Sequence, residues 1–219
     1  MRGINFQNLL LRSLIESDLS LLQPHLEPIT LTPKSVIEMA GRTIRFVCFF
    51  EHGIASTIAE LGPARKIEVA ITGREGLSGI PTLLGSERAP YETRMHTGGL
   101  CHRVEVGILR QLLTQSETLW SRMLNAVQLQ LTQVASTAAS NGLANLEARL
   151  ARWFLMAHDR SDDVTVLVTH DIFASVLGVR RPGLTENMNK LEAFGCLIST
   201  RGRVKITSRV ELMRLSKGT

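Results

Sequence analysis

The chain has 219 residues, of which 44% are apolar and 5% aromatic, and its formal net charge at neutral pH is +5. These values are typical of a globular protein with one large domain or two modest ones. No apolar run reaches the length of about 18 residues that a membrane-spanning helix needs, and the N-terminal stretch lacks the pattern of a secretory signal. We therefore expect a cytoplasmic protein with no membrane association.

The charge is distributed unevenly along the chain. Residues 164–219 contain nine Lys or Arg and four Asp or Glu, whereas residues 1–163 contain sixteen of each kind. A basic segment attached to a neutral body predicts a polyanion as the partner of the C-terminal part.

The three cysteines, Cys48, Cys101 and Cys196, lie far apart and form no CxxC pair. Zinc, iron–sulfur and disulfide frameworks need closer or paired cysteines, so this spacing argues against them. We expect buried thiols with a structural role.

The first third of the chain begins with a helical pattern and continues with strand-like runs. Residues 9–26 read LLLRSLIESDLSLLQPHL, with Ser17 and Asp18 as candidate caps. From about residue 26 to residue 105, short apolar runs are separated by turn pairs such as Thr-Pro, Ala-Gly and His-Gly. This spacing predicts an all-β roll or barrel rather than alternating strands and helices.

Near residue 107 the strand-like runs give way to the apolar spacing of a helix. Residues 106–160 also contain no proline, which is compatible with long helices. Apolar residues then follow the 4,3 spacing of a coiled-coil seam, which favours a dimer. The alternative is that this face packs on the β-roll of the same chain. The predicted seam consists of Trp120, Leu124, Val127, Leu131, Val134 and Ala138.

The stretch SNGLAN at residues 140–145 interrupts this helix. The pair Asn141-Gly142 is a predicted helix stop, and Asn145 is a predicted cap for the next helix. That helix reads LEARLARWFLMAHDR and carries its apolar residues on one face.

Residues 164–209 have the pattern of a helix-turn-helix followed by a β-hairpin. Thr169 can cap the first helix, and Ala174 lies four residues before Gly178. A helix-turn-helix needs a small residue where the helices cross, and a glycine in the turn because φ is positive there. The second helix then places Leu184, Met188 and Leu191 on one side.

The second helix begins in an unusual way, with the sequence GVRRPGLTENMNKLEAFG at residues 178–195. Proline is tolerated in a first helical turn, so Pro182 predicts that Arg180 or Arg181 lies at the cap. Gly183 lets the backbone approach bases or phosphates closely, at a cost of about 1 kcal/mol in helix propensity.

The side of this helix opposite its apolar residues, together with the hairpin STRGRVKI, is the predicted DNA-contacting surface. Gly202 lies at the predicted hairpin tip, and Lys205 is a further phosphate-contacting residue. The alternative is a basic winged domain that docks on protein instead of DNA. The candidate DNA-contacting residues are Thr169, Arg180, Arg181, Gly183, Thr185, Glu186, Asn189, Arg201 and Arg203.

The order of these elements and the motifs LEARLARWFLMAHDR, LGVRRPGLTENMNKLEAFGCLI and RGRVKIT resemble the Crp/Fnr family of bacterial transcription regulators over nearly the whole chain. The resemblance implies an α+β fold with an N-terminal β-roll sensor domain of the cyclic-nucleotide-binding type, a long dimerisation helix and a C-terminal winged helix-turn-helix. It places the sensor domain at 1–115, the dimerisation helix at 116–142 and the DNA-binding domain at 143–219.

The resemblance also implies a homodimer on a palindromic site in double-stranded DNA, with RNA polymerase as a candidate further partner. The recognition helix departs from the family pattern. Arg181-Pro182 stands in place of the usual Arg-Glu pair, and Glu186 stands in place of a later Arg. The usual half-site of the family is therefore not expected.

The region of the family's phosphate-binding cassette departs as well. Ile80 follows Gly79 where the cyclic-nucleotide binders have glutamate, and Pro90 and Tyr91 lie near the arginine position. We therefore expect that cyclic AMP is not the effector, although an unidentified small effector remains open. Candidate effector-contacting residues, between this loop and the long helix, are Glu75, Gly79, Arg88, Tyr91, Arg94, Gln128 and Thr132.

No cysteine precedes Cys48, so the N-terminal cysteine cluster of the oxygen-sensing members is missing. A haem held by His96, Cys101 or His102 is an alternative that we do not favour, and we expect no metal or cofactor. The chain has no His-x-His pair of the cupin type, no Gly-x-Ser-x-Gly and no phosphate loop. We therefore expect that it is not an enzyme. The alternative function is a small-ligand-binding β-roll module, or a cupin-like metalloprotein, with a winged domain that does not bind DNA.

Overall fold

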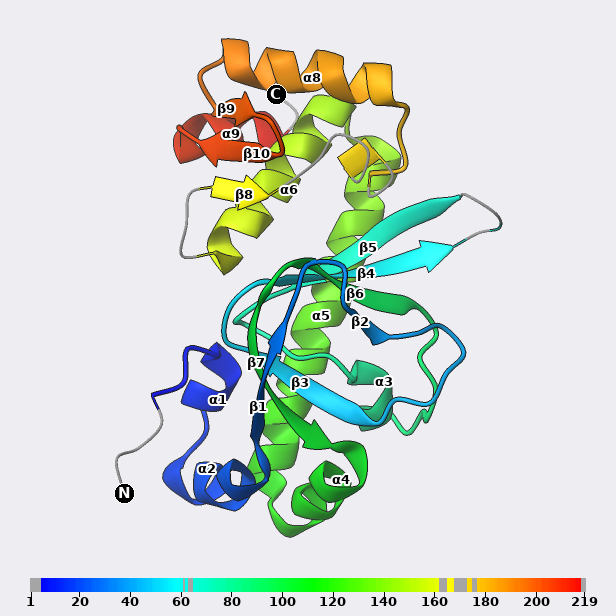
Figure 1. Ribbon diagram of the computed structural model, residues 1–219, viewed down its shortest axis with the longest axis vertical. Coiled ribbons are helices and arrows are strands. Elements are labelled where there is room, and N and C mark those ends of the chain that lie inside the picture. Colours follow the sequence, from blue (N-terminus) through cyan, green and yellow to red (C-terminus); the bar gives the residue numbers. More distant parts are fainter. Residues whose placement is uncertain are drawn as a thin grey trace. The chain divides into compact units, whose positions relative to one another are not determined.

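The structure is a computed structural model, shown in Figure 1, that describes residues 5–60, 62, 65–161, 165–167, 173–174 and 177–217. The chain divides into two compact units. Unit 1 comprises Met1–Thr57 and Thr72–Gln133, and unit 2 comprises Ile58–Ile71 and Val134–Thr219. Unit 2 therefore contains an internal segment of the β-roll region in addition to the C-terminal part of the chain.

Unit 1 begins with two short helices, α1 (Leu9–Arg12) and α2 (Glu16–Leu22), and a 3₁₀ turn, η1 (Gln23–His25). Asn8 caps α1, because its side-chain oxygen accepts a hydrogen bond from the backbone N–H of Leu11 at 3.0 Å.

The prediction that Asp18 caps a helix is wrong. Asp18 lies inside α2 and is buried. Its carboxylate accepts hydrogen bonds from the hydroxyls of Ser116 at 2.6 Å and Thr118 at 2.7 Å. It therefore ties α2 to the start of the long helix, a contact between segments about a hundred residues apart.

The strands of the β-roll form two sheets, which confirms the predicted roll. The first has the order β1 (Glu27–Leu31), β7 (Gly99–Glu105), β3 (Phe46–Phe50). Both outer strands pair antiparallel with β7. The second has the order β2 (Val36–Glu38), β6 (Glu92–Thr97), β4 (Ile54–Glu60), β5 (Lys66–Thr72).

The core of unit 1 forms where helices pack on the roll. A short helix, α3 (Ile80–Leu83), lies between β5 and β6, and α4 (Val106–Gln115) follows β7. Leu22, Phe49, Leu109 and Met123 are buried in one apolar cluster. Full burial of each such side chain contributes about 1.5–3 kcal/mol, so this cluster is a main source of stability.

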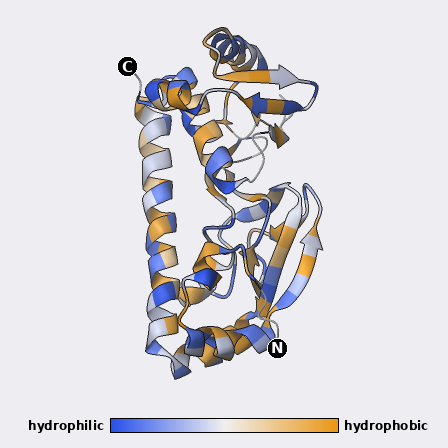
Figure 2. Ribbon diagram, turned by 90° about the vertical axis from the view of Figure 1, so that its left-hand side faces the viewer, coloured by the Kyte–Doolittle hydropathy of each residue, from blue (hydrophilic) through white to orange (hydrophobic). Residues whose placement is uncertain are grey.

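The long helix α5 (Glu117–Leu143) confirms the predicted uninterrupted helix and extends one residue past the predicted stop. Orange and blue bands alternate along it in Figure 2. Leu119, Met123, Ala126 and Val127 are its buried residues. Val127 was placed in the predicted seam, but it lies in the apolar core of its own unit because α5 turns this face toward the roll.

In unit 2, α6 (Leu146–Arg160) follows α5. The predicted cap is confirmed, since the side-chain oxygen of Asn145 accepts a hydrogen bond from Ala148 N at 2.9 Å. Trp153, Phe154 and Phe173 pack edge to face, with ring centroids 4.6–5.5 Å apart.

Among its described residues, the C-terminal part of unit 2 also contains a three-stranded sheet and two further helices. The sheet has the order β8 (Thr165–Leu167), β10 (Arg203–Ile206), β9 (Leu197–Thr200). The helices α8 (Arg181–Ala193) and α9 (Arg209–Ser216) both pack against α6. A winged helix-turn-helix has this composition of helices and hairpin.

Cys48, Cys101 and Cys196 are buried free thiols, as the sequence predicts. Among the described residues, no helix combines the length and the apolar character needed to cross a membrane.

Candidate nucleic-acid interface

The turn that leads into α8 has the predicted geometry. Ala174 and Leu177 are buried, and the carbonyl of Ala174 accepts a hydrogen bond from Val179 N at 2.9 Å. Gly178 has a φ of +65°, which confirms the reason given for a glycine at this position. Thr169, the predicted cap of the first helix, lies outside the described residues.

The first turn of α8 is intact despite its proline and glycine. Arg180 is the N-cap, with φ −77° and ψ 145°, and Pro182 lies in the first turn. No side chain caps the helix. Backbone N–H groups at such an end point outward, and with the helix dipole they favour a negative ligand.

The two sides of α8, the helix labelled in Figure 1, differ in burial. Leu184, Met188 and Leu191 are at most 1% exposed. The helix repeat of 3.6 residues turns most of the other side chains away from this buried side. The exposed candidate residues on and beside this helix are Arg180, Arg181, Thr185, Glu186 and Asn189.

Gly183 is half-buried and has space beside it. A Cβ atom there would meet only Leu146 Cδ2, at 3.9 Å, which is an ordinary contact. Internal packing therefore does not require glycine at this position, and neither does its backbone conformation, because its φ is not positive.

Lys190 is a residue of this surface that the sequence analysis missed. Its Nζ lies 2.8 Å from Glu186 Oε1, an i,i+4 ion pair on the exposed side of α8. The hydrogen bond and the charge of Lys190 lower the pKa of Glu186. The spacing of four residues between Glu186 and Lys190 could have predicted this ion pair from the sequence.

The wing is a β-hairpin, as predicted, and Gly202 at its tip has a φ of +75°. Val204 and Ile206 are buried, whereas Arg201, Arg203 and Lys205 are exposed. The alternation follows from the two-residue repeat of a strand, and it presents the basic side chains to solvent.

A contact that the sequence did not reveal joins the wing to α8. Glu192 Oε1 accepts a hydrogen bond from Ser199 N at 2.6 Å. This bond links the C-terminal turn of the candidate recognition helix to β9, so the two parts of the basic surface are held together.

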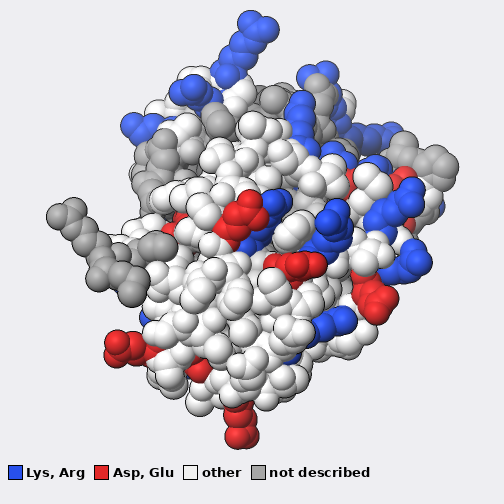
Figure 3. All heavy atoms as spheres, turned by 60° about the horizontal axis from the view of Figure 1, so that its bottom comes forward, with Lys and Arg blue, Asp and Glu red and all other residues white. Residues whose placement is uncertain are grey.

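On the face drawn in Figure 3, charged groups of both signs are mixed. Across the middle of the face in Figure 3, acidic and basic side chains are interspersed among uncharged atoms. Ion pairs such as Lys66–Glu60 and Arg103–Glu27 contribute to this mixing. The described exposed part of α8 and the wing, by contrast, is mainly basic.

The structure gives the candidate effector residues the following individual contacts. Arg88 is exposed, and its Nη1 donates to the carbonyl of Gly41 at 2.9 Å. Tyr91 is 46% exposed. Three further contacts are local: Glu75 accepts from Gly73 N, Arg94 pairs with Glu92, and Gln128 donates to Thr132 Oγ1 on the exposed side of α5.

Gln130 is a polar residue of α5 that reaches the roll. Its side-chain oxygen accepts a hydrogen bond from Thr72 Oγ1 at 3.4 Å. The seam pattern did not distinguish Gln130 from the polar residues around it, because the roll strand that it meets is 58 residues away in sequence.

Glu38, on β2, is another polar residue that the sequence analysis missed. It is 7% exposed, and its carboxylate accepts hydrogen bonds from Gly79 N at 2.6 Å and Thr93 Oγ1 at 3.4 Å. The hydroxyl of Ser78 also bonds to it, and burial raises the pKa of this carboxyl despite these bonds. Hydrogen-bond donors from two separate segments therefore converge on an internal carboxylate beside Gly79, a candidate effector residue.

Among the described residues, no group of three or more His, Cys, Asp or Glu side chains is arranged to hold a metal ion.

Comparison with known proteins supports the assignment of the C-terminal domain. Residues 148–215 match the family of Crp-like helix-turn-helix domains. No curated protein sequence matches the chain.

Solved structures of low sequence identity share the whole fold. The FixK2 protein of Bradyrhizobium japonicum is 13% identical, with a TM-score of 0.74 over 87% of this chain and 96% of that one. A Crp-family transcriptional regulator of Thermus thermophilus is 21% identical, with a TM-score of 0.70 over 87% and 96%. The c-di-GMP-responsive global regulator CLP of Xanthomonas campestris is 19% identical, with a TM-score of 0.67 over 89% and 100%. The family match confirms the resemblance for the C-terminal domain, and the solved structures confirm it for the fold.

Substitution of Glu38 by Gln tests the buried carboxylate. Burial raises the pKa of Glu38 above its ordinary value of 4.5, so the folded protein holds this proton more tightly than the unfolded chain does. This tighter binding of the proton adds to the free energy of unfolding. The addition is fully present below pH 4.5 and is lost as the pH rises through the folded-state pKa of Glu38. We expect the unfolding free energy of Glu38→Gln, relative to wild type, to increase from pH 4.5 toward neutral pH in urea denaturation.

The matched control is Glu87→Gln, which removes one carboxylate charge at an exposed position. A difference between Glu38→Gln and wild type that stays constant over this pH range would contradict the account.

Proposed function

Because the chain carries a Crp-like helix-turn-helix domain and has the fold of Crp/Fnr-type transcription regulators, we propose that it regulates transcription by binding double-stranded DNA sequence-specifically as a homodimer. The observation that carries the proposal is the exposed side of α8, which begins with Arg180 and Arg181 and is linked to a basic wing. The proposed activity is that of a regulator and not of an enzyme.

In the proposed complex, α8 enters the major groove. Its N-terminal end carries two arginines, which bind guanine edges in a bidentate manner or pair with phosphates. Asn189 lies two turns further along the same side. Arg201, Arg203 and Lys205 of the wing contact phosphates, which position the protein but do not read sequence.

Dimerisation is supported by the exposed apolar residues of α5. Trp120 is 36% exposed, Leu124 37% and Leu131 53%, and these residues follow the seam spacing. Ala138 is exposed as well, and Val134 is half-buried. Two-fold symmetry would place two α8 helices about 34 Å apart, one turn of DNA, which is why a palindromic site is proposed.

Glu38 supports the proposal that cyclic AMP is not the effector. The carboxylate already uses the amide of Gly79 and the hydroxyl of Thr93 as donors. A second anion at these donors would have to displace the Glu38 carboxyl from the same hydrogen bonds. We propose that DNA binding needs no cofactor, and RNA polymerase remains a candidate partner.

The first experiment is the selection of bound duplexes from a randomised DNA pool, with purified protein and no added effector. An enriched palindrome supports the proposal and defines the half-site. Weak, salt-sensitive binding without enrichment would contradict DNA recognition by the protein alone and would favour the docking of the winged domain on another protein.

Simultaneous substitution of Arg180 and Arg181 by Ala tests the recognition end of α8. Each bidentate contact with a base contributes about 1–3 kcal/mol of discrimination, so we expect the affinity for the selected duplex to fall at least about tenfold. Fluorescence anisotropy at several salt concentrations would measure this loss. The control is Arg122→Ala on the exposed side of α5, and an equal loss in that variant would refute a specific role for the pair.

Gly183→Ala should change stability and DNA affinity in opposite directions. Alanine improves helix propensity by up to about 1 kcal/mol, and the new Cβ meets no close neighbour. If the backbone approaches DNA here, the same Cβ obstructs it and affinity falls. Gly107→Ala is the matched control, because Gly107 lies in the first turn of α4 with no atom within 4 Å of its would-be Cβ.

We expect the control to gain stability in thermal denaturation and to retain full DNA affinity. Unchanged DNA affinity in Gly183→Ala would show that the glycine does not serve the interface.

Leu131→Glu tests the dimer seam. A charge in a desolvated seam is costly, so we expect sedimentation velocity to show a monomer. The affinity for a palindrome should then fall by about a hundredfold, because the two half-sites are no longer bound by one particle. Leu129→Glu makes the same change at a residue that is 66% exposed and off the seam, and it should remain dimeric. Monomers in both variants, or dimers in both, would be incompatible with this seam.

A further inference from the structure

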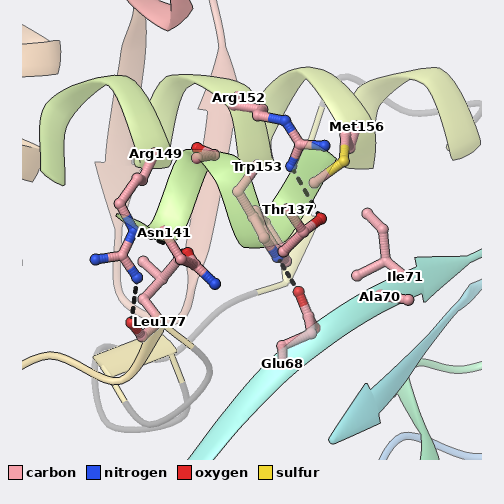
Figure 4. Close-up of a pocket in the computed structure, with 11 residues that line it drawn as sticks. Glu68, Ala70, Ile71, Thr137, Asn141, Arg149, Arg152, Trp153, Met156 and Leu177 are labelled. Atoms are coloured by element: carbon pink, nitrogen blue, oxygen red, sulfur yellow. Dashed lines mark hydrogen bonds between the residues drawn. The ribbon is translucent and has the colours of Figure 1, made fainter. Parts of the chain in front are cut away.

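The distal part of the β4–β5 hairpin, Ile58–Ile71, belongs to unit 2 together with the helix-turn-helix domain. Glu68 on β5 is 6% exposed, and its Oε1 accepts a hydrogen bond from Trp153 Nε1 on α6 at 2.6 Å. Figure 4 shows the two side chains pointing toward each other across a small pocket. A hydrogen bond to a buried carboxylate is short and strong, so this contact attaches the hairpin to α6.

The neighbouring residue on the same strand contacts the turn of the helix-turn-helix. A Cβ atom on Gly178 would lie 3.3 Å from Ile67 Cδ1, so the side chain of Ile67 packs directly against this glycine. The positive φ of Gly178 and the proximity of Ile67 both disfavour any larger residue. The hairpin therefore limits the path of the chain at the turn.

Helix α6 holds the same turn from another direction (Figure 4). Arg149 Nη2 donates to the carbonyl of Leu177 at 2.5 Å, and its Nε donates to Asn141 Oδ1 at 3.0 Å. Arg152 Nη1 donates to Thr137 Oγ1 at 3.2 Å. Leu177 immediately precedes Gly178, so α5, α6 and the hairpin meet around the residues that lead into α8.

Only Val179 separates this turn from Arg180, the N-cap of α8. A displacement of the turn would move the first turn of α8, where Arg180 and Arg181 lie. Contacts with base edges depend on geometry within a fraction of an ångström, whereas phosphate contacts tolerate displacement because long basic side chains adapt.

We propose that Glu68 is a positioning residue for DNA recognition, through which the hairpin segment 58–71 fixes the first turn of α8. The proposal rests on the proposed function, because it assigns a role in reading DNA with α8. Glu68 does not touch DNA in this account. It acts by way of Trp153 and together with the contact between Ile67 and Gly178.

The test compares specific with non-specific binding for wild type, Glu68→Ala, Glu68→Gln and Trp153→Phe. For Glu68→Ala and Trp153→Phe we expect about a tenfold loss of affinity for the selected duplex, which is comparable to the loss of one base-pair contact. Affinity for a scrambled duplex should change less than about twofold, because phosphate contacts dominate it. Glu68→Gln keeps an acceptor for Trp153 Nε1 and should retain most of the specific affinity.

The matched control is Glu60→Ala, an exposed carboxylate on β4 of the same hairpin that pairs with Lys66. It should behave as wild type in both assays. Trp153→Phe preserves the aromatic ring, so the test stands even if Glu68→Ala does not fold. A double variant, Glu68→Ala with Trp153→Phe, should lose no more specific affinity than either single variant, because both remove one bond.

Equal losses for specific and scrambled duplexes, or no loss in either, would overturn the positioning role. If wild type selects no duplex, the proposed function has failed. Hydrogen exchange then decides the positioning role by itself. Faster exchange at the amides of the first turns of α8 in Trp153→Phe than in wild type would support the role, and equal exchange would refute it.

Discussion

The surface that α8 offers to a partner depends on the burial of the other side of this helix. Leu184, Met188 and Leu191 are almost fully buried, and each contributes about 1.5–3 kcal/mol. This burial fixes the rotation of α8 about its own axis. It also offsets the cost of about 1 kcal/mol that Gly183 imposes on the helix. A first turn that looks unsuitable for a helix is therefore stable, and its polar side chains remain in solvent.

Burial sets the rotation of α8, but the position of its N-terminal end depends on a different group of contacts. The turn at Gly178 is held by the guanidinium of Arg149 and is packed by Ile67. Glu68 and Trp153 attach the hairpin to the helix that carries Arg149. Recognition of DNA would in this way depend on Ile67 and Glu68, which lie more than a hundred positions before α8 in the chain. No basic cluster in the sequence marks these two residues as part of a DNA-binding surface.

The interior of the β-roll presents the opposite arrangement, in which a charged group is enclosed. Glu38 directs its carboxylate at the amide of Gly79, and the hydroxyls of Thr93 and Ser78 complete its hydrogen bonds. Donors of this kind are what a bound anion requires, and here a carboxyl group of the protein itself occupies them.

The amino-acid sequence by itself determined the order of helices and strands, the cap at Asn145, the positive φ of Gly178 and the hairpin tip at Gly202. Each follows from the conformational preferences of a residue and its near neighbours, so a local pattern suffices to predict it. Only the tertiary structure decided that Asp18 binds Ser116 and Thr118, that Val127 faces its own core, and that Glu38 and Glu68 are buried acceptors. Hydrogen-bond partners of these carboxylates lie 41 to 100 residues away in the chain. The sequence near an Asp or Glu therefore does not show whether folding buries that residue or leaves it in solvent.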